Sequence, residues 1–352
     1  MTATLAQGKA PLYGFTAFPY DLTLEALENV NTLVIDNSSL YAVHNMGFGD
    51  CLPWQEALKG QAFPQWIQDD WADIKARIPA GVPLSVHITP TQSDRYTLAY
   101  QCGITADEAG QMPQELIDKP YNDPQIITAY SNFAKRVVDY FEPDFLIIGI
   151  EMSELSLSHP EEWEKFAELM TATLERLHAS QPNLKLSVEF VLQSLLLPRV
   201  AEQVKPLVEQ LDFLGISFYP YGSEFGEYFG APALPAPPAQ WLEPLEWLRS
   251  YTEKPIAIVE TGYSSKHRKV NNVNFTGDEA LQAAFLKDLI RFAKEDSYLY
   301  LIWFVPVDYE KLLAKLPQGD TATVAEIWVN TGLFDSDLKP KLAWRTWQTL
   351  KN

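Results

Sequence analysis

The chain has 352 residues, of which 47% are apolar and 12% aromatic, so it is long enough to bury a large core as one big domain or two ordinary ones. Its 46 acidic residues against 27 basic ones give a net charge of −19. This balance argues against a nucleic acid or an anionic membrane as partner, because phosphate binding needs clustered Lys and Arg. An uncharged ligand fits better.

The cysteines and the first residues say little about the environment of the chain. Cys51 and Cys102 have no CxxC spacing, so neither a zinc site nor a disulfide framework is indicated, and whether the two thiols pair stays open. The opening segment MTATLAQGKAPLYG shows no leader, because it has neither a basic start nor an apolar core. If a leader has been removed, a secreted or periplasmic location is favoured. No apolar run reaches membrane-spanning length, and a monomer is expected.

Predicted strands and helices alternate along the chain. After an extended segment at 1–11, eight short apolar runs predict strands at 12–21, 32–45, 83–90, 145–151, 184–193, 213–221, 255–261 and 299–308. Longer amphipathic stretches predict helices at 123–140, 160–180, 199–210, 240–250 and 277–296. In the second of these helices, Trp163, Phe166 and Met170 recur at helical spacing.

The alternation predicts an α/β fold class. Nearly continuous apolar strands between helices indicate a parallel sheet that is covered on its outer side. Eight such units predict a single (β/α)8 TIM barrel over 1–352. A doubly wound open sheet is the main alternative, but no Gly-rich nucleotide loop follows any of the predicted strands. The Pro-rich segment 230–241 is interpreted as a stiff loop, because the strand and helix patterns resume directly after it.

The ends of the predicted strands carry the candidate functional residues, because active sites of such barrels lie at the C-terminal ends of the strands. The fourth strand ends in Glu151 and the seventh in Glu260. Glycoside hydrolysis needs two such carboxylates, since one protonates the leaving oxygen while the other attacks or stabilises the oxocarbenium-like centre. The candidates for substrate binding are Tyr219, Trp303, His44, Asn45, His87, Tyr221 and Tyr263.

Six motifs together resemble a known family: GFTAFPYD, FLIIGIE, DFLGISFYPY, PIAIVETGYS, LYLIWF and NTGLFDSDLKPKLAWRTW. Over 12–347 the chain resembles clan A glycoside hydrolases and is most similar to family 53, the endo-β-1,4-galactanases. The resemblance implies a retaining mechanism with Glu151 as acid/base and Glu260 as nucleophile. It also implies that Tyr219 hydrogen-bonds the nucleophile and that Trp303 forms the platform under the −1 sugar. The expected substrate is a galactan-like or other plant or algal β-linked glycan.

The chain departs from the family in the fourth strand. The family signature there is Gly-Asn-Glu, whose Asn binds the sugar 2-hydroxyl, whereas this chain has Gly149, Ile150 and Glu151. Ile cannot make that hydrogen bond, which contributes several kcal/mol in this chemistry. A second carboxylate, Glu154, follows three residues later and is interpreted as a surface group that is held in reserve as acid/base.

Several candidates also have a structural interpretation. His44, Asn45 and His87 fit internal hydrogen-bond partners as well as substrate contacts, and Tyr221 and Tyr263 fit core packing as well as sugar stacking. No HxH, HExxH or comparable spacing occurs, so neither a catalytic metal nor another cofactor is expected. Glu189 and Gln193 are predicted to lie on one strand, where positions four apart face the same way.

Three function classes remain after these observations. The first is an active retaining glycosidase. The second is a glycan-binding protein on the same scaffold that has lost catalysis, which Ile150 motivates. The third is a barrel enzyme of another class, such as an aldolase or a metal-dependent hydrolase, which would need a catalytic Lys or metal ligands at the strand ends.

Overall fold

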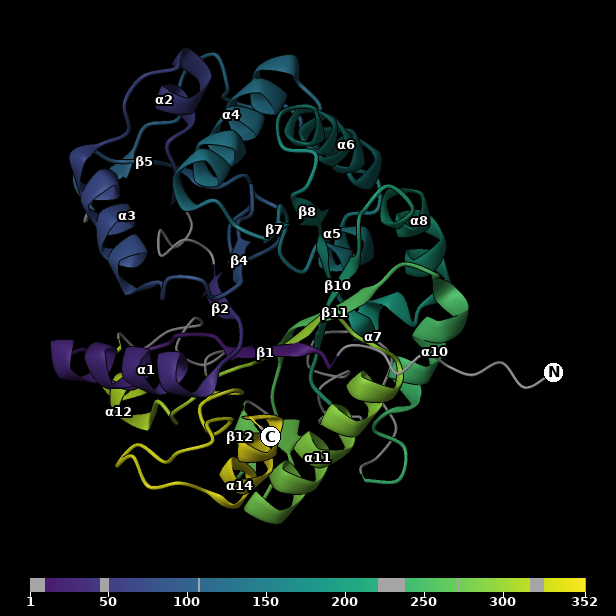
Figure 1. The fold of residues 1–352 in the computed structure, drawn as a ribbon. Coiled ribbons are helices and arrows are strands. Elements are labelled where there is room, and N and C mark those ends of the chain that lie inside the picture. Colours follow the sequence, from purple (N-terminus) through teal and green to yellow (C-terminus); the bar gives the residue numbers. More distant parts are fainter. Residues whose placement is uncertain are drawn as a thin grey trace. The chain divides into compact units, whose positions relative to one another are not determined.

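The computed structural model describes residues 10–44, 51–106, 108–220, 238–270, 273–316 and 326–351. The chain forms two compact units, one from Met1–Tyr41 and Ile216–Asn352, and one from Ala42–Gly215. Figure 1 labels the elements of both units. Two of the predicted binding residues, Asn45 and Tyr221, lie outside the described residues, as does most of the predicted extended segment at 1–11.

Parallel strands form the centre of the unit Ala42–Gly215. The strands of this part of the chain are β2 (Tyr41–His44), β3 (Cys51–Leu52), β4 (Leu84–His87), β5 (Tyr100–Cys102), β6 (Ala109–Gly110), β7 (Phe145–Ile147), β8 (Lys185–Ser187) and β9 (Glu189–Val191). One sheet has the order β2, β4, β7, β8, and β7 pairs in parallel with both β4 and β8. These strands are short and almost wholly buried, as is typical of parallel sheets covered by helices.

Helices of the same unit pack beside this sheet. They are α2 (Trp54–Lys59), α3 (Gln65–Arg77), α4 (Pro124–Phe141), α5 (Ser153–Ser158), α6 (Trp163–Ser180), α7 (Leu192–Leu195) and α8 (Pro198–Val208). Helix α4 begins where its sequence predicts, because the Asp123 side chain accepts a hydrogen bond from the Gln125 amide and Pro124 occupies the first turn. The Tyr130 hydroxyl of α4 donates to the Ile148 carbonyl (2.7 Å) directly after β7, which fixes the helix against the sheet.

A second, small sheet connects the long segment between β4 and α4, which contains β5 and β6, to strand β3. Strand β5 pairs in parallel with β3 and antiparallel with β6. A disulfide joins Cys51 of β3 to Cys102 of β5, with 5.0 Å between the Cα atoms. The pairing that the sequence leaves open is therefore present, and it fastens the inserted segment to the chain ahead of α2.

The unit of Met1–Tyr41 and Ile216–Asn352 also contains parallel strands. Its strands are β1 (Leu12–Phe15), β10 (Leu214–Phe218), β11 (Ile256–Thr261), β12 (Arg268–Val270), β13 (Val273–Phe275) and β14 (Tyr300–Trp303). Strand β14 pairs in parallel with β1 on one side and with β11 on the other, and β10 follows β11. The register between β11 and β14 shifts between Ile258 and Thr261, and such irregularities redirect side chains at the ends of strands.

Helices and aromatic side chains complete this unit. The helical elements are α1 (Leu24–Asn37), α10 (Glu243–Tyr251), α11 (Glu279–Glu295), α12 (Glu310–Leu313), α14 (Leu342–Gln348) and the short 3-10 turn η2 (Thr349–Lys351). Asp278 caps α11 by accepting from the Leu281 amide (2.7 Å). Figure 1 shows α11 beside α14 near the C-terminus. Phe285 of α11 packs on Trp303 of β14, with 6.2 Å between ring centroids.

The predicted elements agree with the structure except at two places. The run TLVID at 32–36 is predicted as strand but belongs to helix α1, and only Tyr41–His44 of the region 32–45 is a strand. The cause is that Ala26, Val30 and Val34 are buried at a spacing of four residues, which makes the apolar run one stripe of a helix. The region 184–193 divides into β8, β9 and α7, so the prediction that Gln193 shares a strand with Glu189 is wrong. No helix in the described ranges is both long and apolar enough to cross a membrane.

Candidate active site

Glu151 follows strand β7 and is held by an arginine. Arg95 Nε and Nη2 both donate to Glu151 Oε2, at 3.2 Å and 2.7 Å. Both residues have a left-handed backbone, with φ of 59° at Arg95 and 56° at Glu151. Residues other than Gly adopt this conformation rarely, and they do so most often at functional sites. The strand end thus presents a carboxylate in a fixed ion pair.

A tight turn positions Arg95. Asp94 accepts hydrogen bonds from the amides of Tyr96 (2.9 Å) and Thr97 (2.8 Å) through Oδ1. Thr91 and Leu98 pair as an antiparallel bridge across the base of the turn. These contacts fix the backbone on both sides of Arg95, so its guanidinium reaches Glu151 from a turn of defined geometry.

Glu154 is a half-buried carboxylate beside this ion pair, so the predicted surface position is correct only in part. It lies in the first turn of α5, and the Ser194 hydroxyl of α7 donates to its Oε1. The pKa of Glu154 is raised to about 7, mainly by burial and also by the charge of Glu151, although Ser194 and Arg95 lower it. A carboxyl group with such a pKa carries a proton near neutral pH, as a general acid must.

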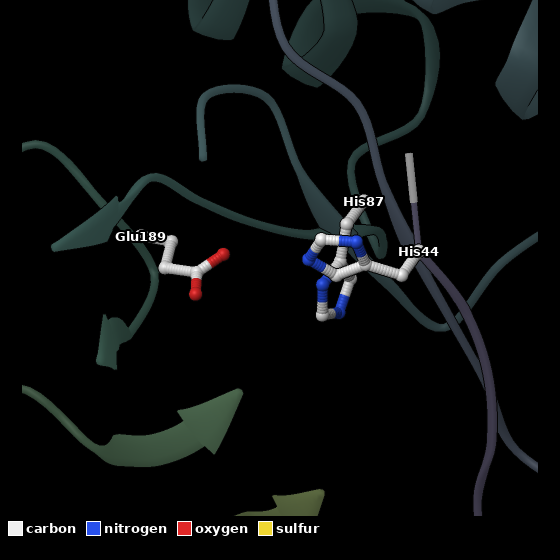
Figure 2. A group of neighbouring side chains, drawn as sticks. All are labelled: His44, His87 and Glu189. Atoms are coloured by element: carbon white, nitrogen blue, oxygen red, sulfur yellow. The ribbon is translucent and has the colours of Figure 1, made fainter. Parts of the chain in front are cut away.

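His44, His87 and Glu189 form a cluster at the ends of β2, β4 and the start of β9, which is called the imidazole–carboxylate cluster below. Figure 2 shows the two rings next to each other and the carboxylate pointing toward them. The ring centroids are 5.2 Å apart, and the Ser85 hydroxyl lies 3.0 Å from His87 Nε2. Burial lowers the pKa of His44 to about 4, with a further contribution from Arg95, and burial lowers that of His87 well below its usual value. Both imidazoles are therefore neutral.

The imidazole–carboxylate cluster contains potential metal ligands. Two neutral imidazoles and one carboxylate are ligands that zinc accepts. One potential ligand atom from each residue lies within 4.8 Å of the others. The donor set is therefore compatible with a divalent metal ion.

Glu260 lies at the end of β11, within the irregular stretch of its pairing with β14. The Tyr219 hydroxyl, directly after β10, donates to Glu260 Oε1 at 2.5 Å. A hydrogen bond from a neutral donor to a carboxylate is short and strong. It holds the carboxylate in one orientation while leaving its charge in place.

Aromatic rings surround this part of the unit, and two of them, Phe304 and Trp328, are half-buried. Trp328 lies edge-on to Tyr219, with 5.9 Å between centroids, and Phe304 contacts Trp328 at 6.5 Å. Tyr309 contacts Phe304 at 6.4 Å. Burial raises the pKa of the Tyr309 hydroxyl well above its usual value, and the charge of Glu260 raises it further. Flat apolar faces next to a carboxylate are the setting in which a sugar ring can stack.

A buried ion pair supports the chain after β14. Lys341 Nζ donates to Asp308 Oδ1 (2.6 Å) and to Ser265 Oγ (2.7 Å), and Lys341 and Asp308 are 6% and 0% exposed. The carbonyl of Gly332 accepts a further hydrogen bond from Lys341 (2.8 Å), and the Asn330 amide donates to Asp308 Oδ2 (3.0 Å). Such a pair is stable because its remaining donors and acceptors are also satisfied.

Comparison with solved structures assigns the fold. The GH53 catalytic domain from Ignisphaera aggregans superposes with a TM-score of 0.58 at 16% identity, over 99% of this chain and 98% of that one. A glycoside hydrolase of family 5, subfamily 18, from Bifidobacterium longum, in complex with Manβ1-4GlcNAc, gives 0.65 at 13% identity, over 97% and 77%. The exo-β-1,4-mannosidase of Opitutaceae bacterium strain TAV5 gives 0.65 at 11% identity, over 98% and 60%.

The fold resembles that of clan A glycoside hydrolases. The resemblance predicted from the sequence is thereby confirmed, including the similarity to family 53. No protein-family model matches the chain, and no curated protein has a matching sequence. At such low identities the similarity shows the fold alone, and the chemistry has to be argued from the residues.

The predicted site residues fall into two groups. His44, His87 and Glu151 lie in the unit Ala42–Gly215, whereas Glu260 and Tyr219 lie in the other unit. Trp303 and Tyr263 belong to the second group as well. Both are buried with 0% exposure, and Trp303 Nε1 donates to the Thr331 carbonyl (2.8 Å). Whether either contacts a substrate stays a prediction.

Sequence reasoning missed part of the candidate site. Arg95 lies just beyond the predicted strand at 83–90, but its separation of 56 residues from Glu151 hides the ion pair. Phe304 directly follows Trp303, so the aromatic run at the end of the eighth strand carried a signal that was assigned to Trp303 alone. Nothing in the local sequence marks Glu154 as half-buried.

Proposed function

We propose that the chain is a retaining glycoside hydrolase that cleaves β-linked glycans, with Glu151 as acid/base and Glu260 as nucleophile. The hydrogen bond from Tyr219 to Glu260 Oε1 carries this proposal. It joins the ends of two neighbouring strands, β10 and β11, and it is the contact that the family resemblance implies for a nucleophile. The proposal includes a closed (β/α)8 barrel formed by 1–352 as one domain.

The nucleophile must be ionised and correctly aimed. Tyr219 orients the carboxylate of Glu260, which is proposed to attack the anomeric carbon. The irregular strand pairing redirects the side chain at this position. The carboxylate of Glu260 loses its negative charge when the glycosyl–enzyme bond forms and regains it when the intermediate is hydrolysed. The hydrogen bond from Tyr219 then stabilises the carboxylate that leaves.

The acid/base must first give and then take a proton. Both hydrogen bonds from Arg95 go to Glu151 Oε2 and hold the side chain that is proposed to protonate the leaving group. Glu154 is coupled electrostatically to Glu151 and can keep a proton nearby at neutral pH. After the aglycone departs, Glu151 acts as base toward the water that hydrolyses the intermediate.

Chemical rescue tests the two roles. Glu260→Ala is expected to lose turnover and to regain it with azide, which yields the α-glycosyl azide from a β-glycoside because the intermediate step is bypassed. Glu151→Ala with azide should instead give the β-glycosyl azide. Glu253→Ala, an exposed carboxylate ahead of β11, serves as the matched control. Unchanged turnover in Glu260→Ala refutes the proposed nucleophile.

The carboxyl separation and the product stereochemistry provide a second test. A retaining mechanism places the two carboxyl groups about 5 to 5.5 Å apart, whereas a separation near 9 Å favours inversion. Proton NMR of the first-formed product distinguishes the two outcomes. Initial release of the α-anomer from a β-glycoside would contradict retention.

The proposed substrate follows from the family resemblance and from the similar structures. Family resemblance points to β-1,4-galactan, while two of the similar structures are a mannosidase and a complex with Manβ1-4GlcNAc. A panel of β-1,4-galactan, β-1,4-mannan and their oligosaccharides, incubated with the wild type and Glu260→Ala, separates these substrates. The disulfide between Cys51 and Cys102 fits an oxidising compartment, and thus a secreted or periplasmic enzyme.

A second candidate function is glycan binding without catalysis. It is favoured by Ile150, which is 1% exposed and replaces the family's sugar-binding Asn. Calorimetric titration with an oligosaccharide from the panel discriminates the two functions. Tight binding without release of reducing sugar over days supports the binding protein and contradicts the enzyme.

A further inference from the structure

A large cavity lies in the inserted segment between β4 and α4, within the unit Ala42–Gly215. Its volume is about 820 Å³, and its wall comes from residues of 92–121 and the start of α6. Ligand pockets of proteins have volumes of about 300 to 1,000 Å³. The cavity is called the insertion pocket below.

We propose that the insertion pocket binds the aglycone-side sugars of an uncharged β-linked glycan. The inference rests on the proposed function, because the orientation of the bound glycan follows from the role of Glu151 as acid/base. It adds a site that determines which chain lengths are preferred.

The wall of the insertion pocket is rigid before any ligand arrives. Tyr100 lines the pocket from strand β5, which is paired on both sides and joined to β3 by the disulfide of Cys102. Tyr100 is nevertheless 52% exposed. An exposed aromatic ring on a fixed strand offers a stacking face at little cost in conformational entropy.

Two further tyrosines extend this surface. One face of Tyr96 is stacked on His159, with 3.7 Å between centroids and planes 4° apart, and 39% of the residue stays exposed. Tyr121 is buried, and its hydroxyl donates to the Tyr96 carbonyl. The stacked pair and the buried hydroxyl hold Tyr96 in place, so two exposed tyrosines line the same pocket.

Both lysines in the pocket wall are paired with carboxylates, and Asp118 adds a negative charge to the wall. Lys165 donates to both oxygens of Glu162 (2.8 Å and 3.0 Å), and Lys119 pairs with Asp123 (3.0 Å). An anionic ligand would have to compete with these carboxylates for the lysines. A neutral ligand with many hydroxyl groups can instead bond to the ion pairs as they are. This favours a sugar over a phosphate or a uronate.

The position of the insertion pocket relative to Glu151 indicates which end of the glycan the pocket binds. Arg95 donates to Glu151, and the next residue, Tyr96, lines the insertion pocket. The same turn therefore holds the acid/base and forms the pocket wall. The acid/base protonates the oxygen of the leaving group, so the sugars nearest to it are those of the aglycone.

The test compares oligosaccharide binding and hydrolysis in Tyr100→Ala. Binding is measured by calorimetry in the Glu260→Ala background with β-1,4-linked oligosaccharides of two to six units. We expect Tyr100→Ala to raise Kd about 5- to 10-fold for the longer chains and to leave that of the disaccharide within about twofold. Tyr100→Phe keeps the ring face and should lose less. Ile104→Ala, which is 87% exposed in the same segment and does not line the pocket, is the matched control.

Hydrolysis supplies the second readout and separates the two proposals. In the active enzyme Tyr100→Ala should raise KM for long chains while kcat for an aryl glycoside is retained. Equal losses for short and long substrates, or no change in Kd for long chains, overturn the insertion pocket as a sugar site while the enzyme assignment stands. Length-dependent binding without any turnover in the wild type supports the pocket and refutes the enzyme. Binding of inorganic phosphate in competition with oligosaccharide contradicts the preference for a neutral ligand.

Discussion

The half-buried carboxyl of Glu154 predicts how the stability of the chain depends on pH. Its pKa of about 7 in the folded chain compares with 4.5 for an ordinary Glu. Between these values the folded chain keeps the proton that the unfolded chain has released. The stability linked to this proton is therefore fully present below pH 4.5 and is lost as the pH rises through about 7. The difference between the two pKa values corresponds to about 3 kcal/mol of unfolding free energy.

Glu154→Gln removes this titration and keeps the shape of the side chain. The amide oxygen of Gln can still accept from Ser194, whose hydroxyl donates to Glu154 Oε1. We expect the variant to match the wild type in unfolding free energy at pH 4 and to exceed it by about 3 kcal/mol at pH 8.5. Urea unfolding at half-unit pH steps, with linear extrapolation to water, measures the difference.

Glu175→Gln is the control, since it makes the same chemical change at an exposed position of α6 and measures the effect of net charge alone. The difference between Glu154→Gln and the wild type must rise with pH. A difference that is constant from pH 4 to 8.5, or one that falls, refutes burial as the cause of the raised pKa of Glu154.

Three further predictions concern stability and metal. Lys341→Met leaves Asp308 buried without its cation and should lower the unfolding free energy by about 3 to 5 kcal/mol, whereas the additional change Asp308→Leu should recover much of it in thermal and urea unfolding. Replacing both Cys51 and Cys102 by Ser opens a loop of 51 residues and should cost about 4 kcal/mol in urea unfolding. Dialysis against a chelator should leave glycoside hydrolysis unchanged, because the two-carboxylate mechanism needs no metal; a loss that zinc restores would make the imidazole–carboxylate cluster a metal site.

Much of the fold follows from local patterns. Strand β14 and strand β11 are short apolar runs between amphipathic helices, and Asp123 and Pro124 predict the start of helix α4. The run TLVID at 32–36 has the same apolar character as a strand, and only its place within the buried stripe of α1 makes it helical. Over so short a run, periodicity cannot separate strand from helix.

The candidate site follows from the sequence only where a strand end marks it. Glu151 and Glu260 are predicted in this way, because active-site residues of (β/α)8 barrels lie at the C-terminal ends of strands. The environment of a carboxylate cannot be predicted in the same way, since it depends on residues that are distant in sequence. Burial raises the pKa of Glu154, and Arg95 pairs with Glu151, and no spacing rule in the sequence predicts either effect.

Ile150 shows how the two kinds of information combine. The family resemblance expects an Asn here, but the side chain is 1% exposed, so an amide in its place would need buried hydrogen-bond partners. Ile150 therefore stabilises the end of the strand through apolar packing. Arg95 brings guanidinium donors to the neighbouring Glu151 instead. A guanidinium only donates hydrogen bonds, so on this side of the proposed site a sugar hydroxyl would have to act as acceptor.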